Sequence, residues 1–319
     1  MTNLDVRPLG TDDLLVTTVG LGCNNFGRVG TRTETLDGTR AVIDAVIDSG
    51  ITLLDTADIY GGGGVSESLM GEALRGRRDR VILATKFGHQ DFAMEGLPAV
   101  PKGSREYIRA AVEGSLRRLQ TDYIDLYQIH TPDPLTPIED TLGALDELAE
   151  EGLIRFSGTS QFDAAQVRAA EETARTLGLR RFVSTQNEYN LLERAAEDSL
   201  LPTASELGVG FLPFFPLANG LFTGKFSRSE HPEGTRLVRQ KSHVLDSAPW
   251  DRIEAFRSFA ESRGISMLAA TFGWMLAQPA LTSVIAGATR PEQVRANAEA
   301  SVAWRPSGDD LDEISRLFS

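Results

Sequence analysis

Four side chains suited to proton chemistry lie in or just after three apolar runs. Asp55 and Tyr60 belong to the run Leu-Leu-Asp-Thr-Ala-Asp-Ile-Tyr (residues 53–60), Lys86 ends the run 81–86, and His130 follows the run 124–129. Burying an aspartate within a strand costs several kcal/mol unless a partner meets it. The chain holds only four lysines, and solubility does not explain one inside an apolar strand, so we expect Lys86 to pair with Asp55.

This pair is expected to act on the tyrosine. A lysine that Asp55 keeps charged favours the tyrosinate, so we expect Lys86 to lower the pKa of Tyr60 toward working pH. Tyr60 would then serve as general acid toward a carbonyl oxygen, and neutral His130 would donate a second hydrogen bond to that oxygen. No nucleophile with an adjacent base is evident, which leaves covalent hydrolysis unsupported. A hydride from a nicotinamide cofactor fits the remaining role.

Short apolar runs alternate with amphipathic segments along the whole chain, as strands and helices do. A short N-terminal piece could form a hairpin, and long loops are expected at 88–103 and 217–249. Strands are expected at 17–22, 52–57, 81–86, 124–129, 154–159, 182–186, 209–214 and 282–285. Helices are expected at 35–49, 66–75, 105–119, 164–177, 194–207, 250–263, 267–277 and 309–318, and two more open with capping boxes at Thr136 and Thr289.

Eight strand–helix units without a linker, and strands apolar on both faces, favour an α/β fold of the (β/α)8 TIM barrel type. We expect residues 1–319 to form a single catalytic domain with an N-terminal hairpin and extra C-terminal helices. The alternative, an open doubly wound sheet, calls for a G-x-G-x-x-G turn. Asn25 replaces the third glycine after Gly22, and the run of glycines 61–64 lacks both the third glycine and a phosphate-loop lysine. That run is interpreted as a tight turn, with Ser66 as the N-cap of the next helix.

The carboxyl ends of barrel strands form the active-site face. Further polar residues fall at these ends and offer groups that recognise an amide such as the nicotinamide carboxamide. They are Asp58, Gln128, Ser160, Gln161, Gln186, Asn187 and Glu188.

Composition excludes several classes of function. A net charge of −13 argues against a nucleic-acid or anionic-membrane surface. One cysteine, Cys23, excludes a disulfide framework and a cysteine-based zinc site, and the four scattered histidines give metal binding little support. The N-terminus has no export signal, and no run approaches the length of a membrane span. We therefore expect a cytoplasmic protein without a metal, whose oligomeric state the sequence leaves open.

A set of motifs runs along essentially the whole chain. They are Gly20-Leu21-Gly22, Leu54-Asp55-Thr56-Ala57-Asp58-Ile59-Tyr60-Gly61, Ser66-Glu67, Ala84-Thr85-Lys86, Asp125-Leu126-Tyr127-Gln128-Ile129-His130, Gly158-Thr159-Ser160-Gln161-Phe162, Gln186-Asn187-Glu188-Tyr189, the run 216–225 and the run 287–297. Together they resemble the aldo-keto reductases, a family of NADPH-dependent carbonyl reductases on a (β/α)8 barrel. The resemblance implies that Asp55, Tyr60, Lys86 and His130 form the catalytic tetrad, with Tyr60 as proton donor to a small carbonyl substrate.

The same resemblance implies where NADPH/NADP+ binds. Ser160, Gln161 and Gln186 would hold the nicotinamide carboxamide, and Phe214 would stack on the ring. The full set of implied cofactor contacts is Gly22, Cys23, Asn24, Asp55, Ser160, Gln161, Gln186, Phe214, Phe215, Pro216, Leu217, Asn219, Lys225, Arg236, Gly287, Thr289, Arg290, Gln293 and Asn297. Arg236 or Arg290 would grip the 2′-phosphate and favour NADPH over NADH.

Departures from the family pattern concern Gln161, where asparagine is usual, and Phe214-Phe215, where Tyr-Ser or Trp-Ser is more common. The short tail after the last expected helix predicts an open substrate mouth, built from residues 24–28, 88–103, 131–137 and 236–250. Two alternatives stay open: a sugar or alcohol dehydrogenase that works mainly in oxidation, and a cofactor-sensing regulatory subunit of an ion channel. The substrate does not follow from the loops.

Overall fold

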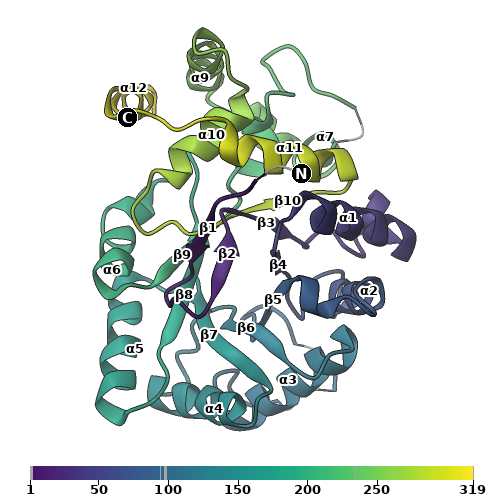
Figure 1. Cartoon of the computed structure of the whole chain (residues 1–319), viewed down its shortest axis with the longest axis vertical. Helices are drawn as coiled ribbons and strands as arrows, with labels where there is room; N and C mark the ends of the chain where they lie inside the picture. Colours follow the sequence, from purple (N-terminus) through teal and green to yellow (C-terminus); the bar gives the residue numbers. More distant parts are fainter. Residues whose placement is uncertain (1–2, 94, 97–98, 234, 319) are drawn as a thin grey trace.

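Eight parallel strands form a barrel that nearly closes, with helices around it (Figure 1). The computed structural model describes residues 3–93, 95–96, 99–233 and 235–318. The (β/α)8 barrel expected from the sequence is confirmed. In spatial order the strands are β10 (Val284–Gly287), β3 (Val19–Gly22), β4 (Leu53–Asp55), β5 (Ile82–Phe87), β6 (Ile124–Ile129), β7 (Ile154–Ser160), β8 (Phe182–Glu188) and β9 (Gly210–Phe214).

The two outer strands of that order meet just before β10 begins. Phe211 in β9 forms a parallel bridge with Leu281, and its amide donates to the carbonyl of Ala280 at 2.8 Å. The amide of Thr282 donates back to the carbonyl of Phe211 at 3.0 Å. The strand expected at 282–285 is observed two residues further on, at Val284–Gly287, where β10 pairs regularly with β3. Residues 280–282 before it bridge to β9.

Alternation along the strands divides the barrel interior into an apolar floor and a polar mouth. Leu53, Ala84 and Leu126 belong to one buried apolar cluster inside the barrel. Two residues further along β4, β5 and β6 come Asp55, Lys86 and Gln128, which have the same parity and point to the same side. The pairing register brings Lys86 opposite Gln128. The carboxylate of Asp55 and the ammonium of Lys86 thus lie above this apolar cluster.

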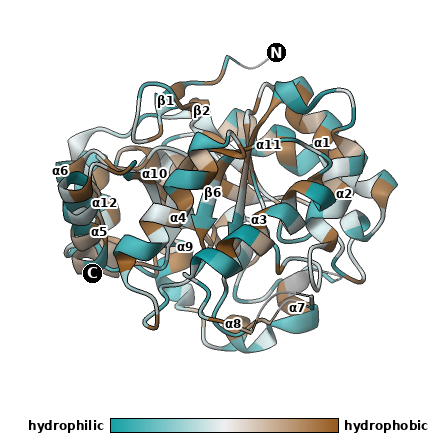
Figure 2. Cartoon of the chain, turned by 90° about the horizontal axis from the view of Figure 1, so that it is seen from below, coloured by the Kyte–Doolittle hydropathy of each residue, from teal (hydrophilic) through white to brown (hydrophobic). Residues whose placement is uncertain are grey.

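The N-terminal hairpin closes the bottom of this floor. Its strands β1 (Val6–Pro8) and β2 (Leu15–Thr17) pair antiparallel, and Leu9, Leu14 and Val16 join the interior cluster. The expected single strand 17–22 is therefore two strands, since Leu15–Thr17 belongs to the hairpin and Val19–Gly22 to the barrel. Figure 2 shows the hairpin at one end of the molecule and the short helices α7 (Arg236–Gln240) and α8 (Ser242–Asp246) at the other.

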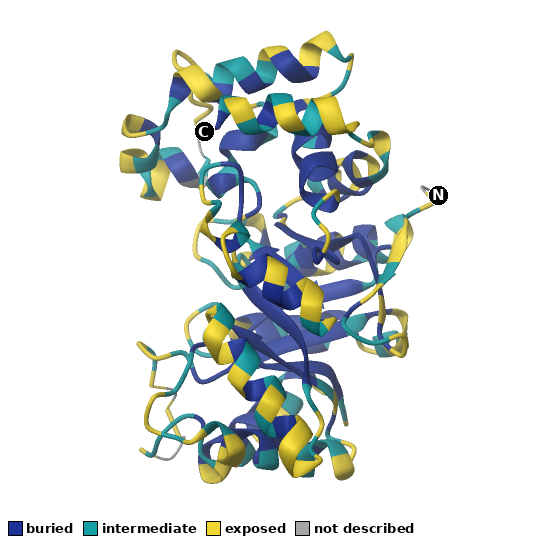
Figure 3. Cartoon of the chain, turned by 90° about the vertical axis from the view of Figure 1, so that its left-hand side faces the viewer, coloured by how far each residue is buried: buried dark blue, intermediate teal, exposed yellow. Residues whose placement is uncertain are grey.

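The outer helices cover the sheet, whose strands are almost entirely buried (Figure 3). The expected helices 105–119 and 164–177 are observed with those bounds. Helix α1 (Leu36–Ser49) begins after its N-cap Thr35 and ends at Gly50, whose φ is 78°. The remaining helical elements are α1 (Leu36–Ser49), α2 (Val65–Ala73), α3 (Arg105–Leu119), α4 (Ile138–Glu150), α5 (Ala164–Leu177), α6 (Leu200–Leu207), α9 (Trp250–Ser262), α10 (Met267–Leu276), α11 (Pro291–Ala303), α12 (Gly308–Leu317) and the 3-10 turns η1 (Arg32–Glu34), η2 (Arg78–Arg80), η3 (Ala195–Glu197) and η4 (Ala218–Thr223).

Three expected caps were wrong. Gly64, not Ser66, is the cap of α2, and the hydroxyl of Ser66 instead donates to the carbonyl of Cys23 at 3.0 Å. Thr136 donates to Asp133 at 2.7 Å, and Pro137 takes the cap position of α4. Arg290 takes the cap position of α11 without a side-chain hydrogen bond. In the first two cases the hydroxyl expected to cap the helix donates instead to a residue before the helix, which is distant in sequence for Ser66 and three residues away for Thr136.

The expected turn at residues 61–64 is confirmed. The four glycines Gly61 to Gly64 have φ values of 75°, 85°, 97° and 84°, in the left-handed region that favours glycine. The expected helix 194–207 divides into η3 and α6, and the expected loop 217–249 contains η4, α7 and α8. Within the described residues, no helix combines the length and the apolar character needed to cross a bilayer.

Candidate active site

A buried ion pair lies at the centre of the barrel mouth. The Nζ atom of Lys86 donates to Oδ2 of Asp55 at 2.6 Å and to the carbonyl of Thr56 at 3.0 Å, and both charged side chains are almost fully buried. The pairing predicted from the sequence is therefore present. Burial alone would lower the pKa of Lys86, but Asp55 and Tyr60 together raise it above its usual value. The ammonium is thus held charged at neutral pH.

Two amides complete the contacts of the aspartate. Nε2 of Gln186 donates to Oδ1 of Asp55 at 3.0 Å, and Nε2 of Gln128 approaches the same oxygen at 3.3 Å. Both glutamines are buried. Gln186 therefore supports the ion pair from across the barrel, a contact that the sequence did not predict. Hydrogen bonds of this kind stabilise the ionised carboxylate and fix its orientation toward Lys86.

Tyr60 lies beside the ammonium, but its pKa moves opposite to the sequence-based expectation. Nζ of Lys86 lies 5.3 Å from the centroid of the Tyr60 ring. Desolvation of the hydroxyl is the largest effect and raises the pKa of Tyr60; Lys86 and a hydrogen bond from Asn24 lower it, and Asp55 raises it. Lys86 lowers the pKa of Tyr60 as predicted, but burial outweighs this one ammonium, so the expected net shift toward working pH was wrong. Tyr60 is therefore protonated at neutral pH.

His130 is neutral. Burial, Lys86 and the neighbouring His89 all lower the pKa of His130 well below its usual range. Its ring meets Tyr60 edge-on at a centroid distance of 5.9 Å and meets His89 edge-on at 4.7 Å. Within the described part of the chain, the buried Nδ1 of His130 has no hydrogen-bond partner. A neutral imidazole in this position can offer one N–H to an oxygen that lies in front of Tyr60.

Asp58 lies apart from the Asp55–Lys86 ion pair, although Asp55 ends strand β4 and Asp58 comes three residues later. Burial and Glu67 raise the pKa of Asp58 to about 7, and Arg118 opposes them. Glu67 is itself fully buried and accepts from Arg118 at 2.7 Å. Asp58 therefore belongs to a separate polar cluster between the barrel and helices α2 and α3.

The expected carboxamide-binding residues gather at the ends of β7 and β8. Ser160 pairs in register with Gln186, and the amide of Gln161 donates to the carbonyl of Gln186 at 2.9 Å. Gln161 has a φ of 61°, which is unusual for a residue other than glycine or asparagine, and its Nε2 donates to the carbonyl of His130 at 3.1 Å. The extra methylene of Gln161 thus directs its amide toward the histidine.

The expected stacking and pyrophosphate residues follow β9. Phe214 is half-buried and meets the exposed Phe215 edge-on at 5.3 Å. Phe215 and Asn219 have positive φ values of 52° and 60°, and Oδ1 of Asn219 accepts from Lys241 at 2.8 Å. Backbone strain of this kind collects at binding sites. The other implied contacts here are the buried Pro216, the half-buried Leu217 and the exposed Lys225.

The expected adenosine-end residues lie at the end of β10 and the start of α11. Thr289 donates through its amide to Oε1 of Gln293 at 2.8 Å, and Asn297 is buried one turn further on. Arg290 is exposed at the cap position. Arg236 begins α7, but its side chain lies outside the described part of the structure.

A nicotinamide cofactor fits these strand ends. Gly22 and Gly287 are register partners, and an added Cβ would lie 3.1 Å from Ile285 at the first and 3.3 Å from Asn25 at the second, so the absence of side chains keeps this edge open. Helix α11 has no side-chain cap, which leaves amide groups at its N-terminus to receive a phosphate. The Cys23 side chain is fully buried, so it offers no exposed thiol to a cofactor.

Known proteins resemble this chain in sequence and in fold. The sequence model of the aldo/keto reductase family matches residues 18–317. The chain belongs to the aldo/keto reductase family. The structure of the aldo-keto reductase AKR11C1 from Bacillus halodurans, in a holo form, is similar with a TM-score of 0.78 and 33% identity, and the match covers 99% of this chain and 97% of that one.

Two relatives carry names that describe different functions. The L-glyceraldehyde 3-phosphate reductase of Escherichia coli (strain K12) is 32% identical over 310 residues, which cover 93% of this chain and 87% of that protein. The probable voltage-gated potassium channel subunit beta of Oryza sativa subsp. japonica is 32% identical over 272 residues, which cover 82% and 81%. As a member of this family, the chain is an oxidoreductase of the type that uses a nicotinamide cofactor on small carbonyl compounds.

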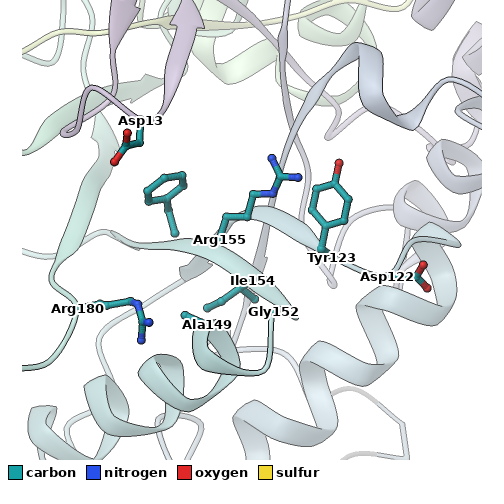
Figure 4. A pocket seen from close by; sticks show the side chains of 9 residues that line it. Asp13, Asp122, Tyr123, Ala149, Gly152, Ile154, Arg155 and Arg180 are labelled. Atoms are coloured by element: carbon teal, nitrogen blue, oxygen red, sulfur yellow. The ribbon is translucent and has the colours of Figure 1, made fainter.

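Figure 4 shows a shallow pocket of about 560 Å³ at the other end of this aldo/keto reductase barrel. Both of its arginines have partners: Arg155 lies over the ring of Tyr123 at 4.1 Å, and Arg180 pairs with Asp146 at 2.8 Å. The opposite face of a barrel serves stability rather than catalysis. The candidate active site is therefore the end of the barrel that holds Asp55, Tyr60, Lys86 and His130.

The sequence predicted no role for two residues that lie close to Tyr60 and His130. His89 packs on His130, and Arg28 hydrogen-bonds to Asn24, which in turn contacts Tyr60. Both belong to loops of this aldo/keto reductase, where neither periodicity nor a strand end marks them. The only signal was position, since each follows an active-site strand within a few residues.

Proposed function

We propose that this chain, acting as one catalytic domain over residues 1–319, reduces an aldehyde or ketone to an alcohol with NADPH. The observation that carries the proposal is the set of contacts around Tyr60. A charged Lys86 bound to Asp55 lies beside the Tyr60 ring, and neutral His130 faces Tyr60 edge-on. This set provides a proton donor and a hydrogen-bond donor for one oxygen.

Each member of the tetrad has a distinct task in this proposal. Tyr60 gives its proton to the carbonyl oxygen as negative charge develops there, and His130 orients that oxygen with one N–H. Lys86 stabilises the tyrosinate that remains, and Asp55 keeps Lys86 charged and fixed. The bound cofactor supplies the hydride that the carbonyl carbon receives. Burial of the tetrad strengthens each of these electrostatic interactions.

The cofactor is expected to lie along the strand ends described above. Ser160, Gln161 and Gln186 would hold the carboxamide, and Phe214 would support the ring. The amide groups at the start of α11 would receive a phosphate, and Arg290 would contact the 2′-phosphate of NADPH.

The proposal is tested with a panel of aromatic aldehydes, keto-sugars, dicarbonyls and steroids, with oxidation of NADPH and NADH followed by absorbance. We expect turnover of at least one class of aldehyde or ketone with NADPH, at a higher kcat/KM than with NADH. Turnover confined to alcohol oxidation with NAD would instead support the dehydrogenase alternative. Binding of NADPH without turnover of any carbonyl would contradict the proposal.

Replacing Arg290 tests the cofactor preference. We expect Arg290→Ala to weaken NADPH binding about 10-fold, because a guanidinium–phosphate contact contributes on the order of 1.5 kcal/mol, and to leave NADH binding nearly unchanged. Fluorescence titration with each cofactor measures both constants. Arg295→Ala is the matched control, since Arg295 is exposed on the same helix one turn away. Equal losses for NADPH and NADH would exclude a 2′-phosphate contact.

A further inference from the structure

Arg28 folds back over the active-site mouth from the loop that follows β3. Its Nη2 donates to Oδ1 of Asn24 and lies 3.4 Å from the carbonyl of the same residue. The loop around it is pinned, because the hydroxyl of Thr31 donates to the carbonyl of Arg28 at 2.8 Å and Thr33 donates to the carbonyl of Asn25 at 2.9 Å. The half-buried guanidinium is therefore held in place rather than extended into solvent.

Asn24 links Arg28 to the proton donor. The Asn24 side chain hydrogen-bonds to the Tyr60 hydroxyl on one side and accepts from Arg28 on the other. The guanidinium thus lies two hydrogen bonds away from the hydroxyl that meets the substrate oxygen. Burial lowers the pKa of Arg28 and Tyr60 raises it, which agrees with a desolvated guanidinium near the tyrosine.

Within the described residues, Arg28 has no carboxylate partner and donates only through Nη2. Neighbouring cations differ. Lys102 donates to three backbone carbonyls, among them that of Phe92 at 2.8 Å, and Arg239 donates to the carbonyl of Gly30 at 3.1 Å. Those two cations order loops, whereas most of the guanidinium of Arg28 is left for something else. In a chain with a net charge of −13, a half-buried arginine without a counter-ion needs an explanation.

We propose that Arg28 binds an anionic group of the substrate, so that this enzyme prefers short aldehydes or ketones that carry a carboxylate or a phosphate near the carbonyl. A guanidinium offers a planar pair of N–H groups that match the oxygens of either anion. The carbonyl oxygen lies at Tyr60 and His130, and the anionic end of a short substrate reaches the adjacent Arg28. Partial burial keeps this ion pair from being screened as a surface pair is.

The inference rests on the proposed carbonyl reduction and is tested with matched pairs of substrates. One pair is 4-oxobutanoate and butanal, and the other is glyceraldehyde 3-phosphate and glyceraldehyde. For wild type we expect kcat/KM to be at least about 10-fold higher for the anionic member of one pair, and which pair shows it distinguishes carboxylate from phosphate. We expect Arg28→Gln to reduce that preference about 10- to 100-fold, chiefly through KM, because the ion pair holds substrate and transition state alike.

Arg32→Gln provides the matched control. Arg32 lies four residues away and is exposed. Its substitution removes the same charge, so the preference for the anionic substrate of each pair should persist. A fall of equal size on charged and neutral substrates in Arg28→Gln would overturn the inference and leave Arg28 as a support for Asn24. Wild-type turnover of aldehydes without any charge preference would also overturn it while the proposed function stands. Absence of turnover on every aldehyde would refute the proposed function itself.

Discussion

Replacing Tyr60 with phenylalanine is expected to lower kcat for carbonyl reduction by about 10²- to 10⁴-fold, the range that a positioned general acid contributes. The ring remains, so its ring contacts with Lys86 and His130 are kept, while the hydroxyl that donates the proton is lost together with its hydrogen bond to Asn24. NADPH affinity, measured by fluorescence titration, should be unchanged. Steady-state rates on the best aldehyde of the panel give the comparison.

The raised pKa of Tyr60 sets the pH dependence of wild type. A tyrosine with a raised pKa keeps its proton through neutral pH, so the reduction rate should be flat there and fall in the alkaline range as the proton is lost. Tyr60→Phe should lack that fall. Tyr123→Phe, at the opposite end of the barrel, is the matched control and should behave as wild type. Near-wild-type turnover in Tyr60→Phe would remove Tyr60 from the mechanism.

The barrel and the pairing of Asp55 with Lys86 at its mouth were predictable because both follow from periodicity. Two-residue alternation in the strands places Asp55, Lys86 and Gln128 above an apolar floor, and any barrel built from those strands brings their ends together. Helix α5 was predicted to its observed bounds, since its own Asp163 and Gln166 form a capping box and Gly178 ends it. Local signals suffice where a residue's partners are its sequence neighbours.

Predictions failed where residues outside the helix compete for a side chain. Ser66 and Thr136 look like helix caps, but the distant Cys23 and the nearby Asp133 accept hydrogen bonds from their hydroxyls. The pKa of Tyr60 depends on how much protein surrounds its hydroxyl, and no sequence pattern measures that quantity. Arg28 is a similar case. Our proposal for it depends on the absence of a carboxylate partner among the described residues, and only the fold reveals that absence.

Replacing Lys86 with methionine is expected to have the second large effect, on stability as well as on turnover. The change leaves the Asp55 carboxylate buried with only the amides of Gln128 and Gln186 near it. Removing one partner of a buried ion pair costs about 3–5 kcal/mol, because the remaining charge is uncompensated. Urea denaturation should show that loss at neutral pH, and Arg168→Met, which breaks an exposed pair with Glu206, should change stability little.

The double variant Asp55→Asn/Lys86→Met separates stability from chemistry. With both charges gone, the uncompensated carboxylate is gone too, so much of the lost stability should return. Turnover should not return, because Tyr60 has lost the ammonium that stabilises its anion. Recovery of turnover in the double variant would assign Lys86 a purely structural role.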